Sequence, residues 1–170
     1  MSGESYGFTV KAFNFNGEGE ESTVAYFKPC TVPSNLAEPE ILETTRSSIS
    51  FKWTAPEDNG ACPIEGYVLY LDEGVTGSAF SPVDEDVIAD KDYLRTHTVS
   101  FDASEEGLIF RYILEAKNEI GSVQSSIGVQ LLAGVPGKPE QPPVSDPAVT
   151  NGERIKVVWL EPLDDGGSDI

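Results

Sequence analysis

The sequence predicts an all-β fold in which seven-stranded antiparallel sandwiches of two sheets are repeated in tandem. Three observations predict it. Apolar and polar residues alternate with a period of two, clusters of Pro, Gly, Asn and Asp end these stretches, and the whole pattern recurs along the chain. Helical periodicity is absent. Seven short strands in about 100 residues suit two packed sheets whose alternate side chains face inward.

Two different motifs establish the repeat. The alternating motif Ile-x-Phe-x-Trp at 49–53 recurs as Ile-x-Val-x-Trp at 155–159, and the two tryptophans are 106 positions apart. An aromatic alternation that ends in Asn-x-x-Gly occupies 6–17 and recurs at 110–121, which is an offset of 104. Self-similarity with a period of about 105 residues is typical of a tandem array of like modules.

The phase of the repeat divides the chain into three parts. Residues 1–32 carry the last two strands of one module, 33–135 form a complete module, and 136–170 carry the first two strands of a third. The strands expected in the complete module are 38–43, 48–53, 65–72, 79–82, 96–101, 109–118 and 124–132. The residues expected in the core are Trp53, Tyr67, Leu69, Val99, Tyr112 and Leu114, with Trp159 in the equivalent role in the third module.

The partial modules at the two ends have open edges and an uncovered apolar face, so half a sandwich is not expected to be ordered alone. Two interpretations remain open. The segment belongs to a longer tandem array or filament, or the tail of one chain completes the head of the next by strand donation.

Three features resemble the fibronectin type III family. Trp53 lies in the second strand with Pro56 and a turn at Gly60 after it, the stretch 63–67 leads into the third strand, and both aromatic motifs look like the family's sixth strand. The resemblance covers the whole chain and implies an immunoglobulin-like sandwich and a non-catalytic tandem module. The chain departs from the family at Phe110, because a tyrosine there usually bonds back to the preceding loop.

Cys30 and Cys62 are expected to form a disulfide. Cys30 lies just before the first strand and Cys62 between the second and third, so this topology places both at one pole of the module. The corresponding residues of the next unit are Ala133 and Ser168, and such paired loss is what a disulfide predicts. A bridge would indicate an oxidising compartment and an extracellular or cell-surface protein. The alternative is two free thiols in an intracellular, cytoskeletal protein.

Charge and composition exclude several function classes. Eleven Lys and Arg against 29 Asp and Glu give a net charge of −18, which would repel nucleic acid and anionic membrane surfaces. No apolar run reaches the roughly 18 residues that a membrane span needs, so no direct membrane insertion is expected. His97 is the only histidine, so neither a nucleophile with its base nor a zinc set is expected. We therefore predict no catalytic residue and no cofactor.

The acidic stretch after residue 83 leaves one metal open. Asp84, Asp86 and Asp90 offer the hard oxygen ligands that calcium prefers, although their spacing does not match an EF-hand loop. The alternative is a solvated acidic surface that keeps the modules soluble.

The predicted function is a non-catalytic structural or adhesive segment of a larger cell-surface or extracellular protein, with the capacity to form filaments. Its partners would be neighbouring modules of the same chain or identical chains in a fibre. One alternative is a binding module whose pole loops grip a protein or a glycan. Others are a cytoskeletal or axonemal ruler and a regulatory segment attached to an enzyme. The loop residues expected for binding are Asp58, Asn59, Glu119 and Ile120.

Overall fold

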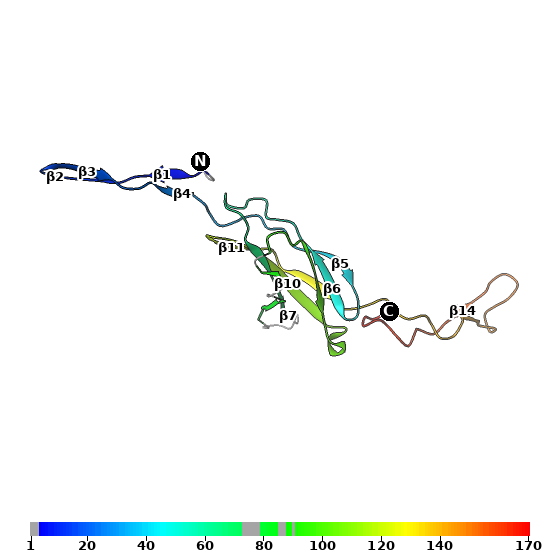
Figure 1. The fold of residues 1–170 in the computed structure, drawn as a ribbon. Helices are drawn as coiled ribbons and strands as arrows, with labels where there is room; N and C mark the ends of the chain where they lie inside the picture. The colour runs from blue at the N-terminus through cyan, green and yellow to red at the C-terminus, as the bar shows by residue number, and fades with distance from the viewer. Residues whose placement is uncertain (1–3, 73–78, 85–87, 90) are drawn as a thin grey trace.

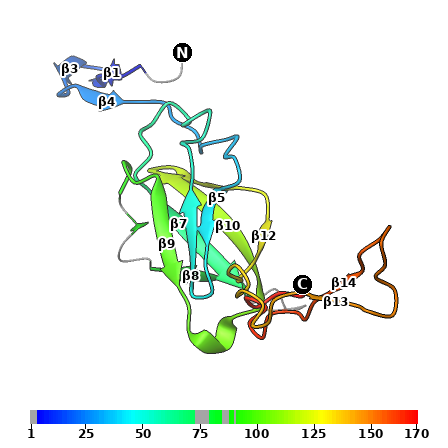
Figure 2. The same ribbon diagram turned by 90° about the vertical axis from the view of Figure 1, so that its right-hand side faces the viewer.

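The computed structural model describes residues 4–72, 79–84, 88–89 and 91–170, and its regular structure is built from antiparallel β-strands. The predicted all-β fold class is confirmed. A narrow ribbon of short strands lies at one end, a two-sheet sandwich lies in the centre, and a largely irregular segment follows at the other end (Figure 1). A view turned by 90° has the same order of parts (Figure 2).

The central sandwich consists of two sheets. The first has the order β5-β6-β9 and the second has the order β11-β10-β7-β8, with β12 also paired to β10. The strands of the first sheet are β5 (Glu40–Thr44), β6 (Ser48–Lys52) and β9 (Thr96–Ser100). Those of the second are β7 (Gly66–Asp72), β8 (Ser81–Val83), β10 (Ile109–Asn118), β11 (Gly121–Gln124) and β12 (Gly128–Leu131). A short 3-10 turn, η1 (Ala103–Glu105), leads from β9 to β10.

The strand expected at 124–132 is shorter in the structure, where β12 covers Gly128–Leu131, and a separate strand, β11 (Gly121–Gln124), comes before it. β11 pairs with the C-terminal half of β10, and β12 pairs with its N-terminal half. Between them the Ser125 hydroxyl accepts a hydrogen bond from the Leu114 amide at 3.1 Å, and the Ser125 amide donates to the Leu114 carbonyl at 2.8 Å. The serine side chain thus replaces a ladder bond, and the chain bulges before pairing resumes.

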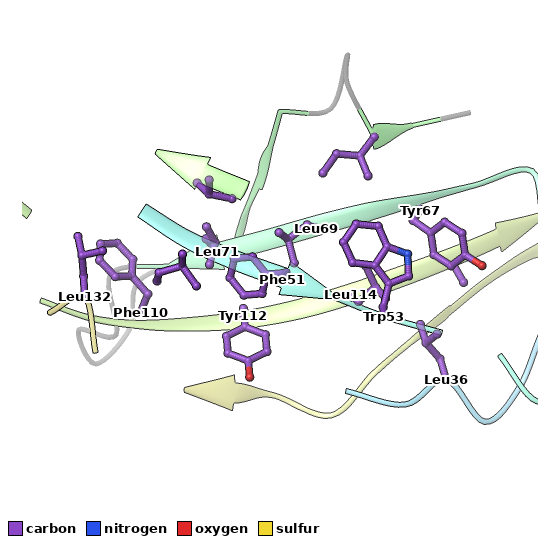
Figure 3. Packing of buried hydrophobic residues seen from close by; sticks show 14 residues of the cluster. Leu36, Phe51, Trp53, Tyr67, Leu69, Leu71, Phe110, Tyr112, Leu114 and Leu132 are labelled. Atoms are coloured by element: carbon purple, nitrogen blue, oxygen red, sulfur yellow. The ribbon is translucent and has the colours of Figure 1, made fainter. Parts of the chain in front are cut away.

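The apolar core fills the space between the two sheets (Figure 3). Phe51 of the first sheet meets Tyr112 of the second edge to face at 5.1 Å between ring centroids, and the Trp53 and Tyr67 rings lie 5.8 Å apart. The buried cluster contains every core residue expected in this module, namely Trp53, Tyr67, Leu69, Val99, Tyr112 and Leu114.

Tyr112 carries a polar group at the edge of the core, and this group has a partner. The Tyr112 hydroxyl donates to Glu38 Oε1 at 3.1 Å, and burial, followed by this bond, raises the pKa of Tyr112 to about 12. Phe110 packs its ring 4.5 Å from that of Phe101, so an apolar contact occupies the position where the family usually has a tyrosine.

The ribbon at residues 4–27 repeats strand pairing that also occurs in the sandwich, but its side chains are exposed. It consists of β1 (Tyr6–Phe8), β2 (Lys11–Asn14), β3 (Gly17–Glu21) and β4 (Ala25–Phe27). Asn14 pairs with Gly17 as Asn118 pairs with Gly121, which is the 104-residue offset found in the sequence. Phe8 is nevertheless 56% exposed, whereas Tyr112, its equivalent, is 4% exposed.

The predicted core position of Trp159 is wrong. It was expected in a core, but it is 67% exposed, whereas its equivalent Trp53 is 3% exposed. Trp53 is covered by Tyr67 on the opposite sheet. Near Trp159 the described chain provides only the short pair β13 (Val144–Ser145) and β14 (Val157–Val158), and no second sheet faces it there.

We expect Phe51→Ala to destabilise the central sandwich by about 3 to 5 kcal/mol, because it removes a fully buried ring and leaves a cavity beside Tyr112. Chemical denaturation followed by tryptophan fluorescence measures this change. Phe13→Ala is the matched control, since that ring is 82% exposed and its loss should change the free energy of unfolding by less than about 0.5 kcal/mol. Equal effects from the two substitutions would contradict the assignment of the core.

Candidate functional site

The pole of the sandwich next to the ribbon is built from three segments, and we call it the N-terminal pole. They are the linker 30–34, the loop 58–62 between β6 and β7, and the turn 119–120 between β10 and β11. The buried Asn118 joins them, because its Nδ2 donates to the Thr31 carbonyl at 2.8 Å and to the Asn59 carbonyl at 2.9 Å. Its Oδ1 accepts from the amide of the following turn at Ile120. One side chain therefore satisfies groups of all three segments.

Sequence reasoning assigned no role to Asn118. The signal was present in the Asn-x-x-Gly sequence that ends both aromatic motifs. In the ribbon the equivalent Asn14 uses its Oδ1 in the same way and accepts from the Asn16 amide at 2.8 Å.

The disulfide between Cys30 and Cys62 is present, with the two Cα atoms 5.6 Å apart. It joins the linker to the loop 58–62 at the N-terminal pole. Glu119 lies beside it, with Oε1 3.4 Å from Cys30 Sγ and 2.6 Å from Cys62 Sγ. These three ligand-type atoms lie within 4.8 Å of one another. Because the sulfurs are bonded to each other, they are not the thiolates that a metal ion requires, and the group is a disulfide with an acidic neighbour.

The structure brings the four predicted loop residues to this pole. Asp58 Oδ1 accepts from the Gly60 amide and Asn59 Oδ1 accepts from the Ala61 amide, both at 2.9 Å, so two consecutive side chains fix the turn. Gly60 has φ of 70°, and a Cβ there would overlap the Thr31 carbonyl. Glu119 and Ile120 are exposed on the adjoining turn.

The opposite pole, which we call the C-terminal pole, repeats the contact between linker and loop. At the N-terminal pole the Thr31 amide donates to the Gly60 carbonyl at 2.9 Å and the Ser34 amide to the Asp58 carbonyl at 2.8 Å. At the C-terminal pole the amides of Gly134 and Gly137 donate to the carbonyls of Gly166 and Asp164, both at 2.8 Å. The same linker geometry thus occurs twice, one repeat apart.

An ion pair reinforces the C-terminal pole. Arg46, in the turn between β5 and β6, places Nη2 2.5 Å from Asp164 Oδ1. The hydrogen bond to Asp164 raises the pKa of Arg46, and the hydrogen bond from Arg46, followed by that from the Gly166 amide, lowers the pKa of Asp164. No pattern in the sequence pointed to Arg46, because its partner comes from a distant part of the chain.

The acidic residues proposed for calcium are only partly described. Asp84 Oδ2 lies 2.7 Å from His97 Nε2, so its carboxylate has a protein partner. Asp86 and Asp90 lie outside the described residues. The same contact uses the ring of the single histidine, which projects from β9. In the ranges that the structure describes, no helix is long and apolar enough to cross a membrane.

Comparison with known proteins gives relatives in sequence and in structure. No family model matches the chain. Fibronectin type-III domain-containing protein 3A of Homo sapiens is 28% identical over 169 residues, which cover 97% of this chain and 13% of that protein. Fibronectin type-III domain-containing protein 3a of Gallus gallus is 29% identical over 170 residues, which cover 97% of this chain and 13% of that protein. The chain thus spans 13% of the length of these two relatives.

Solved structures share the fold. A crystal structure of titin domains matches with a TM-score of 0.56 at 19% identity and covers 73% of this chain and 39% of that one. The solution structure of a fourth fibronectin type III domain of human origin matches with a TM-score of 0.52 at 21% identity. The match covers 71% of this chain and 96% of that one. The fold is therefore that of an immunoglobulin-like β-sandwich module. The chain is a fibronectin type III domain protein, as the sequence motifs predicted, and its relatives support a module of a larger protein.

We expect reduction of the disulfide to destabilise the central sandwich by about 3 to 4 kcal/mol, because a closed loop of this length restricts the unfolded chain. Urea unfolding with and without a reductant measures this difference. The double variant Cys30→Ser with Cys62→Ser should unfold like the reduced protein and should not respond to the reductant. An unfolding midpoint of the native chain that ignores the reductant would contradict the prediction.

Proposed function

We propose that this chain is a non-catalytic structural spacer within a tandem array of an extracellular or cell-surface protein. Its modules would follow the repeat, with boundaries near residues 32 and 135, and the neighbouring modules of the same chain would be its partners. Identical chains would be the further partners in a fibre. Adhesion and filament formation would follow from such an array.

The observation that carries the proposal is the repeated contact between linker and loop. A flexible linker would leave its amides to water, whereas here two amides on each side of the sandwich donate to the following loop. Prolines in both linkers restrict the backbone further, because the ring fixes φ. Successive modules would therefore keep a fixed spacing.

Two further features support the compartment and the absence of catalysis. A disulfide is a feature of oxidising compartments, which favours the extracellular or cell-surface location over a cytoskeletal one. The His97 side chain makes a hydrogen bond with the carboxylate of Asp84, whereas a histidine that acts as the base in nucleophilic catalysis is also bonded to the hydroxyl or thiol that it activates.

Small-angle X-ray scattering of the oxidised chain tests the proposal. We expect one elongated particle whose distance distribution matches the structure. The double variant Pro136→Gly with Pro139→Gly should broaden this distribution, because it frees the backbone of the second linker. If the native chain scatters as a flexible ensemble, as broad as the glycine variant, the spacer function is wrong.

A second candidate function is a binding module, and the convergence of loops 58–62 and 119–120 at the N-terminal pole favours it. Ile120 is half-exposed there, beside the carboxylate of Glu119. An apolar side chain with polar neighbours on a rigid loop is a usual contact for a protein or a glycan.

Binding to an array of immobilised glycans tests this candidate. If the pole binds a glycan, Ile120→Ala should lower the signal about tenfold, which corresponds to the loss of one well-packed contact. Ile127→Ala is the matched control, because that side chain is equally exposed but lies between β11 and β12. Absence of binding, or equal losses in both variants, would count against a glycan site.

A further inference from the structure

The C-terminal pole of the central sandwich has a basic centre with acidic and carbonyl oxygens around it. Arg46 Nε lies 3.6 Å from Glu106 Oε1, and Nη2 donates to the Val135 carbonyl at 3.2 Å. The same Nη2 contacts Asp164 Oδ1 at 2.5 Å. One guanidinium thus joins the turn after η1, the linker and the loop 164–167 of the following segment.

The loop 164–167 has its own internal structure. The Gly166 amide donates to Asp164 Oδ1 at 3.1 Å, and the Gly167 amide donates to Asp165 Oδ1 at 2.8 Å. Loop 58–61, one repeat earlier, has the same two bonds at the same positions. The loop conformation is therefore a property of the module, and Arg46 meets a surface that is already formed.

Backbones approach closely where this loop meets the sandwich. A Cβ on Gly166 would lie 2.5 Å from the Gly134 carbonyl oxygen, and one on Gly167 would lie 2.8 Å from Glu106 Cγ. Gly107 faces the Gly167 carbonyl oxygen, 3.2 Å from its ideal Cβ position. The first loop carries Ala61 at the position of Gly167, so glycine is not needed for the turn itself. Gly167 instead suits the contact with the sandwich, where a Cβ would come too close to Glu106.

We propose that the C-terminal pole is a docking surface for the loop between the second and third strands of the following module, and that Arg46 recognises the first aspartate of that loop. The inference rests on the tandem function proposed above and adds how orientation is set between modules. The backbone bonds hold the linker, while the guanidinium fixes the rotation of the loop against the sandwich. The required partner is a loop of the form Asp-x-Gly-Gly, with its aspartate ionised.

Hydrogen exchange of the full chain, followed residue by residue by NMR, tests this inference. The reporters are the amides of Gly134 and Gly137, which donate across the contact. We expect Arg46→Ala to speed their exchange about two- to fivefold, the range for an exposed ion pair. Asp164→Asn should do the same, because it keeps the oxygen that accepts from Gly166 and removes only the charge.

Two controls make the result specific. The amides of Thr31 and Ser34 make the equivalent bonds at the N-terminal pole and should not change in either variant. Lys52→Ala removes another exposed cation, 3.8 Å from Glu40, and should leave Gly134 and Gly137 unaffected.

Unchanged exchange at Gly134 and Gly137 in Arg46→Ala and Asp164→Asn would overturn the inference. Equal acceleration at all four amides would overturn it as well, since that indicates a general loss of stability. If Arg46→Ala disturbs the sandwich, Asp164→Asn decides alone, because Asp164 lies outside its strands. If the exchange test fails while the native chain still scatters as one elongated particle, the role of Arg46 is wrong and the spacer function stands.

Discussion

The constraint on which this structure depends is that an alternating strand pair must be covered by a second sheet. Trp53 and Trp159 occupy equivalent places in the repeat, yet only Trp53 is buried, because Tyr67 projects from the opposite sheet onto it. The aromatic residues of the ribbon obey the same rule. Periodicity makes a strand able to join a sandwich, and the hydrophobic gain arises only when the facing sheet is present.

The poles follow from this packing. When the two sheets lie face to face, the ends of β6, β7 and β10 come together, and their loops bring polar backbone groups close to the core. Such groups must find partners, and the side chain of the buried Asn118 makes hydrogen bonds to four of them. The dense hydrogen bonding of the N-terminal pole thus results from satisfying backbone groups at the end of a sandwich.

The sequence was informative where one face alone is buried. β6, β9 and β10 were predicted within one residue because their burial alternates along the strand. β7 was also predicted within one residue, although its sequence is a mostly apolar run and not an alternation. The break between β11 and β12 was missed, since a serine hydroxyl replacing a ladder bond leaves alternation unchanged. The cysteine pair was visible through topology, because both residues fall at one pole. Arg46 was not visible, since its partner is set by how a distant loop returns to the sandwich.

The two linkers make the same backbone contact with a loop, but the reinforcement differs. A disulfide ties the first linker to loop 58–62, so salt should matter little there, whereas the exposed ion pair between Arg46 and Asp164 reinforces the second contact and is screened by salt. The pKa of Asp164 lies below its ordinary value of about 4, so the ion pair stabilises the contact at the C-terminal pole fully above that pH. Its contribution is lost only as the pH falls through the lowered pKa. Mild acidification to about pH 5 therefore leaves the ion pair at the C-terminal pole intact, whereas a reductant acts on the contact at the N-terminal pole, where the disulfide lies.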